Sequence, residues 1–138
     1  MGREDEIQRL LQYLQNEGIR ATDDFVKDIQ RLVLTDVKKF ASQIFKDFSR
    51  RKYSKYNRFE QLKLTKQQKE EIDGYALWRY EYRNTSNLRC IFILEKDNNN
   101  SVPILICAFN ENGHKKKGEN SYPHNIARAI EIIKRNAQ

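Results

Sequence analysis

Both histidines of the chain lie in one short segment, NGHKKKGENSYPHN, at residues 112–125. An imidazole has a pKa near neutrality, so a histidine can take up or release a proton during a reaction at physiological pH. Three lysines follow the first histidine directly, and their ammonium groups can balance the charge of a phosphate. The candidate proton-transfer residues are therefore His114 and His124, and the adjacent cations are Lys115, Lys116 and Lys117.

These residue types suit acid–base chemistry at a phosphate, and the cleavage of RNA without a metal ion, which the family resemblance given below implies, is one such reaction. In that reaction the ribose 2′-hydroxyl attacks the adjacent phosphate, and the protein supplies a base, cations for the charge that builds up on phosphorus, and an acid for the departing 5′-oxygen. The ordinary interpretation stays open beside this one. A surface histidine at a helix start is often a capping or solvated group, and a run of lysines is common on protein surfaces.

A second group of cations occupies residues 50–69, which contain eight Lys or Arg and one acid. The whole chain has a net charge of +7, so the excess is concentrated in this segment. Such a concentration predicts a polyanion or an acidic protein as the partner. In RRKYSKYNRF, aromatic residues alternate with cations, as in grooves that stack unpaired bases and follow their phosphates. The candidate binding residues here are Arg50, Arg51, Lys52, Tyr53, Lys55, Tyr56 and Arg58.

The aromatic residues of this segment also fit a hydrophobic core. Tyr53 and Tyr56 are three residues apart, so both side chains can lie on one inward face of a helix. In that case the cations only cover the aromatic residues. The sequence leaves the two interpretations equally open.

The first half of the chain has helical periodicity. Apolar residues repeat at three- and four-residue spacing between Ile7 and Leu14, and Gly18 is suited to end that helix. Thr22 is the predicted N-cap of a second helix, which turns Phe25, Ile29 and Leu32 inward. A third helix is predicted from an apolar stripe over residues 37–48.

After Gly74 the periodicity changes to that of strands. LWRYEYR (77–83) alternates aromatic and charged residues, and two apolar runs follow at 88–95 and 102–109, separated by the turn residues KDNNNS. These three segments predict an antiparallel meander. Residues 122–135 predict a final amphipathic helix, and residues 65–73 either a short polar helix or a loop.

Together these elements predict one α+β domain over residues 1–138. Residues 1–60 form a helical N-terminal part, and residues 61–138 form a small antiparallel sheet of three or more strands with a C-terminal amphipathic helix. Cys90 and Cys107 lie in apolar strands, so we expect reduced core thiols, and their spacing to the histidines fits no zinc motif. We therefore expect no metal and no cofactor. The N-terminus carries no signal sequence and no long apolar run is present, which predicts a cytoplasmic protein without a membrane partner.

The order of these parts resembles the RelE/ParE superfamily of bacterial toxins, in particular its HigB-like, phage-associated branch. The resemblance covers roughly residues 60–135 and depends on LWRYEYR, LRCIFILE and VPILICAFNENGHKKKG. It implies a RelE-like fold and an endoribonuclease that cuts messenger RNA, commonly on the ribosome. It also implies a cognate antitoxin, an acidic protein that wraps a basic groove.

The resemblance assigns a site to specific residues. Arg89 matches the basic residue at the head of the middle strand, Lys115 to Lys117 match the basic loop after the last strand, and His124 matches a C-terminal His or Tyr. The predicted catalytic residues are Arg89, His114, Lys116 and His124, with Lys115 and Lys117 binding the RNA. Two alternatives stay open: an inert nucleic-acid- or protein-binding regulator of a phage or mobile element, and a ParE-like topoisomerase inhibitor.

Overall fold

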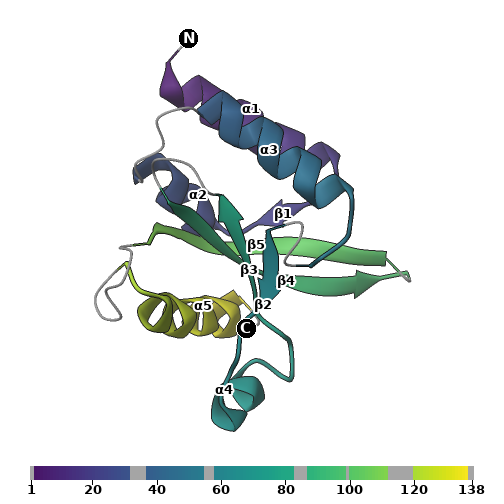
Figure 1. Ribbon diagram of the computed structural model, residues 1–138, viewed down its shortest axis with the longest axis vertical. Coiled ribbons are helices and arrows are strands. Elements are labelled where there is room, and N and C mark those ends of the chain that lie inside the picture. Colours follow the sequence, from purple (N-terminus) through teal and green to yellow (C-terminus); the bar gives the residue numbers. More distant parts are fainter. Residues whose placement is uncertain are drawn as a thin grey trace.

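The computed structural model describes residues 2–31, 37–54, 58–82, 87–98, 100–111 and 120–136. A five-stranded sheet lies at the centre, with α1 (Arg3–Asn16) and α3 (Val37–Ser49) on one side and α5 (Tyr122–Asn136) on the other (Figure 1). The other elements are β1 (Arg20–Ala21), α2 (Asp23–Arg31), β2 (Phe59–Gln61), α4 (Lys66–Glu71), β3 (Trp78–Tyr82), β4 (Leu88–Asp97) and β5 (Asn100–Asn110). The predicted α+β class is therefore confirmed.

The strand order is β1-β5-β4-β3-β2. β3, β4 and β5 form the predicted antiparallel meander, in which Glu81 pairs with Arg89 and Arg89 with Phe109. β2 adds an antiparallel strand beside β3. The prediction of an antiparallel sheet needs one correction, because β1 runs parallel to β5 and makes the sheet mixed. Two residues are too few to give a periodic signal, so β1 was not predicted.

Both edge strands come from the N-terminal part of the chain. β1 pairs Arg20 and Ala21 with Ile104 and Leu105 of β5. β2 begins at Phe59, at the end of the basic aromatic segment. The helical half of the chain therefore completes the sheet that the C-terminal half begins.

The helix boundaries follow local signals. Gly18 has φ 74°, and its N–H donates to Gln15 O while the N–H of Ile19 donates to Leu14 O, which closes the last turn of α1. Thr22 caps α2 as predicted, since its Oγ1 accepts from the N–H of Phe25 at 3.1 Å. Thr65 and Gln68 form a capping box, so the short polar helix is the correct alternative for residues 65–73.

Each face of the sheet has its own hydrophobic core. The face toward α1 and α3 buries aromatic side chains, including Tyr80 and Tyr82 of β3, as their alternation with Arg79 and Glu81 predicted. The face toward α5 buries Ile, Leu, Cys and Phe side chains. Arg79 and Glu81 thus project from the sheet on the same side as α5, and this is the side on which charged residues of the strands gather.

Cys90 and Cys107 are buried free thiols, as predicted. Burial raises the pKa of Cys107 to about 12, so the thiol stays protonated and unreactive at neutral pH. Among the described residues, no helix is both long and apolar enough to span a membrane.

Candidate active site

His124 lies in a polar hollow at the start of α5. The hollow has a volume of about 220 Å³ and is formed where α2, β5 and α5 meet. His124 is exposed to solvent, and the guanidinium-bearing residues Arg31 and Arg128 line the same hollow. The remaining lining residues are Ala108, Phe109, Asn120 and Asn125. An imidazole and two cations therefore share one small solvent-accessible space.

Asp28 fixes the two arginines. Its carboxylate is completely buried and accepts hydrogen bonds from Arg128 Nη1 and Nη2 at 2.8 and 2.7 Å and from Arg31 Nη2 at 2.9 Å. The N–H of Ala108 in β5 donates to the same carboxylate at 2.9 Å. Asp28 thereby joins α2, the edge of the sheet and α5, and it holds both guanidinium groups at the hollow.

The described side chains that line the hollow, together with Asp28, carry a net positive charge. Asp28 neutralises only one of the two arginines, and the hydrogen bond to this carboxylate is the main cause that raises the pKa of Arg128, so that arginine stays charged. The Arg31 side chain remains 72% exposed and can contact a solute. The hollow also lies at the N-terminal end of a 15-residue helix, where the helix dipole favours anions.

Ser121 positions the first turn of α5. Its Oγ accepts from the N–H of His124 at 3.3 Å, and its carbonyl oxygen accepts from the side-chain amide of Asn125 at 2.7 Å. Ser121 and Asn125 are both buried. The backbone that carries the imidazole is therefore held by polar contacts, while the imidazole itself points out of the core.

Arg89 lies elsewhere. It is one strand further into the sheet than the hollow, beside Phe109, and its Nε donates to Glu111 at 2.9 Å. Only 11% of the Arg89 side chain is exposed. The predicted arrangement places Arg89 and one of Lys115 to Lys117 at one phosphate, with His114 or His124 nearby; the lysines and His114 lie outside the described residues, and Arg89 does not line the hollow. Arg31 and Arg128 occupy the positions next to His124 instead.

Arg89 belongs to a cluster of ion pairs on the α5 side of the sheet. Arg79 pairs with Glu60 of β2 and with its own neighbour Glu81, and its Nη1 donates to the Tyr122 hydroxyl at 3.3 Å. Burial raises the pKa of Tyr122 to about 12, although Arg79 partly opposes this shift. Among the described residues of this cluster, three carboxylates face two guanidinium groups, so these residues offer no excess cation to a phosphate.

The segment after α3 divides into exposed cations and a partly buried tyrosine. Arg50, Arg51 and Lys52 are exposed, as a phosphate-binding role requires. Arg58 instead donates to the buried carboxylate of Asp47 at 3.3 Å. The same carboxylate accepts from the hydroxyl of Tyr80 at 2.5 Å and from Gln43. Arg58 is therefore committed to an internal ion pair, although 42% of its side chain remains exposed.

Tyr53 takes part in an aromatic cluster. Its ring lies 5.1 Å from Phe59, 5.9 Å from Phe92 and 6.1 Å from Trp78, measured between centroids. Burial raises the pKa of its hydroxyl, and Arg51 partly opposes the shift. Of the two interpretations of this residue, the core alternative describes its position, because its partly buried side chain packs against the hydrophobic core.

Several predicted residues lie outside the part of the chain that the structure describes. They are Lys55, Tyr56, His114, Lys115, Lys116 and Lys117. The structure therefore gives no position for the lysine run. Within the described ranges, no group of three or more His, Cys, Asp or Glu side chains could hold a metal ion.

The sequence analysis did not single out Asp28, Arg31 or Arg128 as site residues. One signal was present: Asp28 lies on the predicted inward stripe of α2, between Phe25 and Ile29, where an acid must be paired if it is buried. Its partner is 100 residues away along the chain, so the sequence pattern could not identify it.

Comparisons of the chain with protein-family models, with curated proteins and with solved structures gave no match.

Proposed function

We propose that the protein is a metal-independent endoribonuclease of the toxin type, and that it cleaves messenger RNA at the hollow beside His124. One observation carries the proposal: an exposed imidazole shares this hollow with two guanidinium groups that keep a net positive charge. The resemblance to RelE-like toxins motivates the choice of RNA as substrate, and a cognate acidic antitoxin is part of the same proposal.

The proposed reaction starts with a phosphodiester bound to Arg31 and Arg128. The ribose 2′-hydroxyl attacks the phosphorus, and the bond to the 5′-oxygen breaks. His124 accepts the proton of the 2′-hydroxyl, and the departing 5′-oxygen takes up a proton from water, while the guanidinium groups stabilise the added negative charge on the phosphate oxygens. The products are a 2′,3′-cyclic phosphate and a 5′-hydroxyl, and no metal, oxidant or reductant is consumed. In this proposal Arg31 and Arg128 bind the phosphate, a role that the resemblance had implied for Arg89 and the lysines at 115–117.

The test is cleavage of RNA by the purified full chain, with and without ribosomes. We expect 5′-hydroxyl and 2′,3′-cyclic phosphate ends, activity in the presence of EDTA, and no cleavage of a substrate with a 2′-deoxy sugar at the scissile position. His124→Ala should lower the rate by about 10²- to 10⁴-fold. Cleavage that is unaffected by this substitution would contradict the proposed site.

A matched pair of arginine variants tests the phosphate ligands. Arg31→Ala should slow cleavage, whereas Arg135→Ala should not, because Arg135 is an exposed α5 residue that pairs with Asp24 and does not line the hollow. Both side chains are largely exposed, so both variants should fold. Equal cleavage rates for the two variants would show that the scissile phosphate does not bind in this hollow.

A second candidate function is an inert nucleic-acid-binding regulator. It is favoured by α3, whose only acid, Asp47, is buried while its lysines are exposed. This candidate predicts RNA binding without new RNA ends, and no effect of His124→Ala on binding. Induction of the chain in bacteria separates the two: growth arrest that His124→Ala relieves supports cleavage.

A further inference from the structure

The solvent face of α3 and the turn after it carry only basic and small polar side chains. The exposed residues on this face are Lys38, Lys39, Ser42, Lys46, Ser49 and Arg50. Within the described part of the chain, no ion pair involves Lys38, Lys46 or Arg50. Their charges are therefore available to a ligand, and the hydroxyl groups between them are short enough to let that ligand approach the helix.

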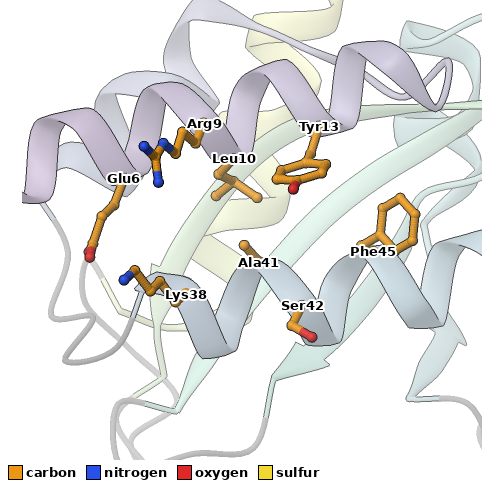
Figure 2. A pocket seen from close by; sticks show the side chains of 8 residues that line it. All are labelled: Glu6, Arg9, Leu10, Tyr13, Lys38, Ala41, Ser42 and Phe45. Atoms are coloured by element: carbon orange, nitrogen blue, oxygen red, sulfur yellow. The ribbon is translucent and has the colours of Figure 1, made fainter. Parts of the chain in front are cut away.

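A groove between α1 and α3 adjoins this face. It has a volume of about 460 Å³, and Figure 2 shows Glu6 and Lys38 at one end and Tyr13 and Phe45 at the other. The Tyr13 side chain projects from α1 into the groove and is 57% exposed. Its ring centroid lies 6.2 Å from that of Phe45, with an angle of 69° between the planes.

An exposed tyrosine ring beside unpaired cations matches the chemistry of a single-stranded nucleic acid. The ring can stack on an unpaired base, and the lysines can bind the phosphates on either side of it. A duplex offers no free base face to the ring. Apolar side chains also line the groove (Leu10, Ala41 and Phe45), so the choice of a nucleic acid over an amphipathic partner helix rests on the cations of α3 that have no ion pair among the described residues.

We infer that the α1–α3 groove and the adjoining solvent face of α3 bind a single-stranded RNA segment. A base stacks on Tyr13 in the groove, and the phosphates contact Lys38 at the groove and Lys46 and Arg50 on the adjoining face. The choice of RNA over DNA rests on the proposed function. The groove lies on the opposite side of the sheet from α5 (Figure 1), so it is separate from the hollow at His124. It would add affinity for long RNA without taking part in cleavage.

The test measures binding of a labelled single-stranded RNA of about 16 nucleotides, the upper end of known single-strand site sizes, by fluorescence anisotropy with the full chain. His124→Ala serves as the background, so that cleavage does not interfere. Tyr13→Ala should weaken binding by about fivefold to a hundredfold, and Tyr13→Phe should restore it because the ring is kept. Lys46→Ala should weaken binding as well.

Two matched controls lie away from the groove. Tyr75 is the other exposed tyrosine, and Lys66 is an exposed lysine of α4; Tyr75→Ala and Lys66→Ala should bind RNA like the background protein. Binding that does not change in Tyr13→Ala, or that changes equally in Tyr75→Ala, would overturn the inference. Equal and Tyr13-dependent binding of DNA of the same sequence would overturn the choice of RNA.

Failure of the groove assignment can be distinguished from failure of the proposed function. If Tyr13→Ala weakens binding but the unsubstituted chain never cleaves RNA, the groove assignment holds and the nuclease proposal fails. If the chain cleaves RNA and Tyr13→Ala binds it normally, the nuclease proposal holds and the groove assignment fails.

Discussion

The arginines on the α5 side of the sheet differ from the exposed lysines of α3 on the other side in what they contact, although Arg58 on the α3 side also pairs with a buried acid. On the α5 side, Arg79, Arg89 and Arg128 each donate to carboxylates and are largely buried. On the other side, Lys38 and Lys46 of α3 are exposed and have no acidic partner among the described residues. The paired arginines hold elements of the fold together, and the unpaired lysines are free to bind. The net charge of the chain therefore does not distinguish cations that stabilise the fold from cations that can bind a ligand.

The largest effect should come from the buried carboxylate at the centre of the paired side. Asp28→Ala leaves the Arg128 guanidinium and the N–H of Ala108 without their partner, so we expect a loss of about 3–5 kcal/mol in the free energy of unfolding. Urea denaturation measures it. The matched control is Asp24→Ala, which removes an exposed pair with Arg135 and should cost about 0–1 kcal/mol. Equal losses would show that Asp28 has no special role.

The next largest effect should appear when one cation from each side of the sheet, Arg89 or Lys46, is replaced by alanine. Arg89→Ala removes a half-buried hydrogen bond to Glu111 and should cost about 1.5–3 kcal/mol of stability. Lys46→Ala should leave the urea midpoint unchanged, because it is an exposed residue without a partner. RNA affinity should fall more in Lys46→Ala than in Arg89→Ala, which is the reverse of the expected order of their losses in stability. If both variants lose stability alike, the distinction between paired and unpaired cations fails.

Alkaline pH should act on the core rather than on the arginine pairs. Burial raises the pKa of Cys107 from 9.0 to about 12, so the folded state holds this proton more tightly than the unfolded state does. The stability that the folded state gains from holding the Cys107 proton is fully present below pH 9 and is lost as the pH rises through about 12. Cys107→Ala should therefore make stability fall less steeply across that window, as measured by urea midpoints at successive pH values. An identical fall in both proteins would contradict this.

The smallest effect is on salt dependence. Binding of single-stranded RNA should weaken with ionic strength, and each lost phosphate contact should reduce the slope of log K against log salt by about 0.7. Lys46→Ala should show that reduction, and Lys66→Ala should not. A slope that is the same for Lys46→Ala as for the unsubstituted chain would mean that Lys46 does not contact the phosphates.

Local sequence signals predicted most of the elements. Gly18, Thr22 and Gly74 marked helix ends or breaks, and the alternation in LWRYEYR fixed which side chains of β3 face which core. β1 and β2 were not predicted. They contain two and three residues, and such short strands form because a neighbouring strand pairs with them rather than because of their own pattern.

The candidate site was predicted in part. His124 was identified from its residue type and from its exposed position on a predicted helix, and the structure places it at the hollow. Arg89 was expected to share a phosphate with one of Lys115 to Lys117; those lysines lie outside the described residues, and Arg89 is on β4, where Glu111 is its partner. Residue type indicates what a side chain can do, whereas its neighbours depend on how distant strands pair.

The sequence by itself determined the class of the fold, the helix ends, the alternating faces of β3 and the excess of positive charge. Each of these depends on residues within about one or two turns of a helix or a few residues of a strand. The tertiary structure alone decided which cations are neutralised. Whether an arginine meets a carboxylate depends on contacts such as that of Arg128 with Asp28, between residues that lie far apart in the chain.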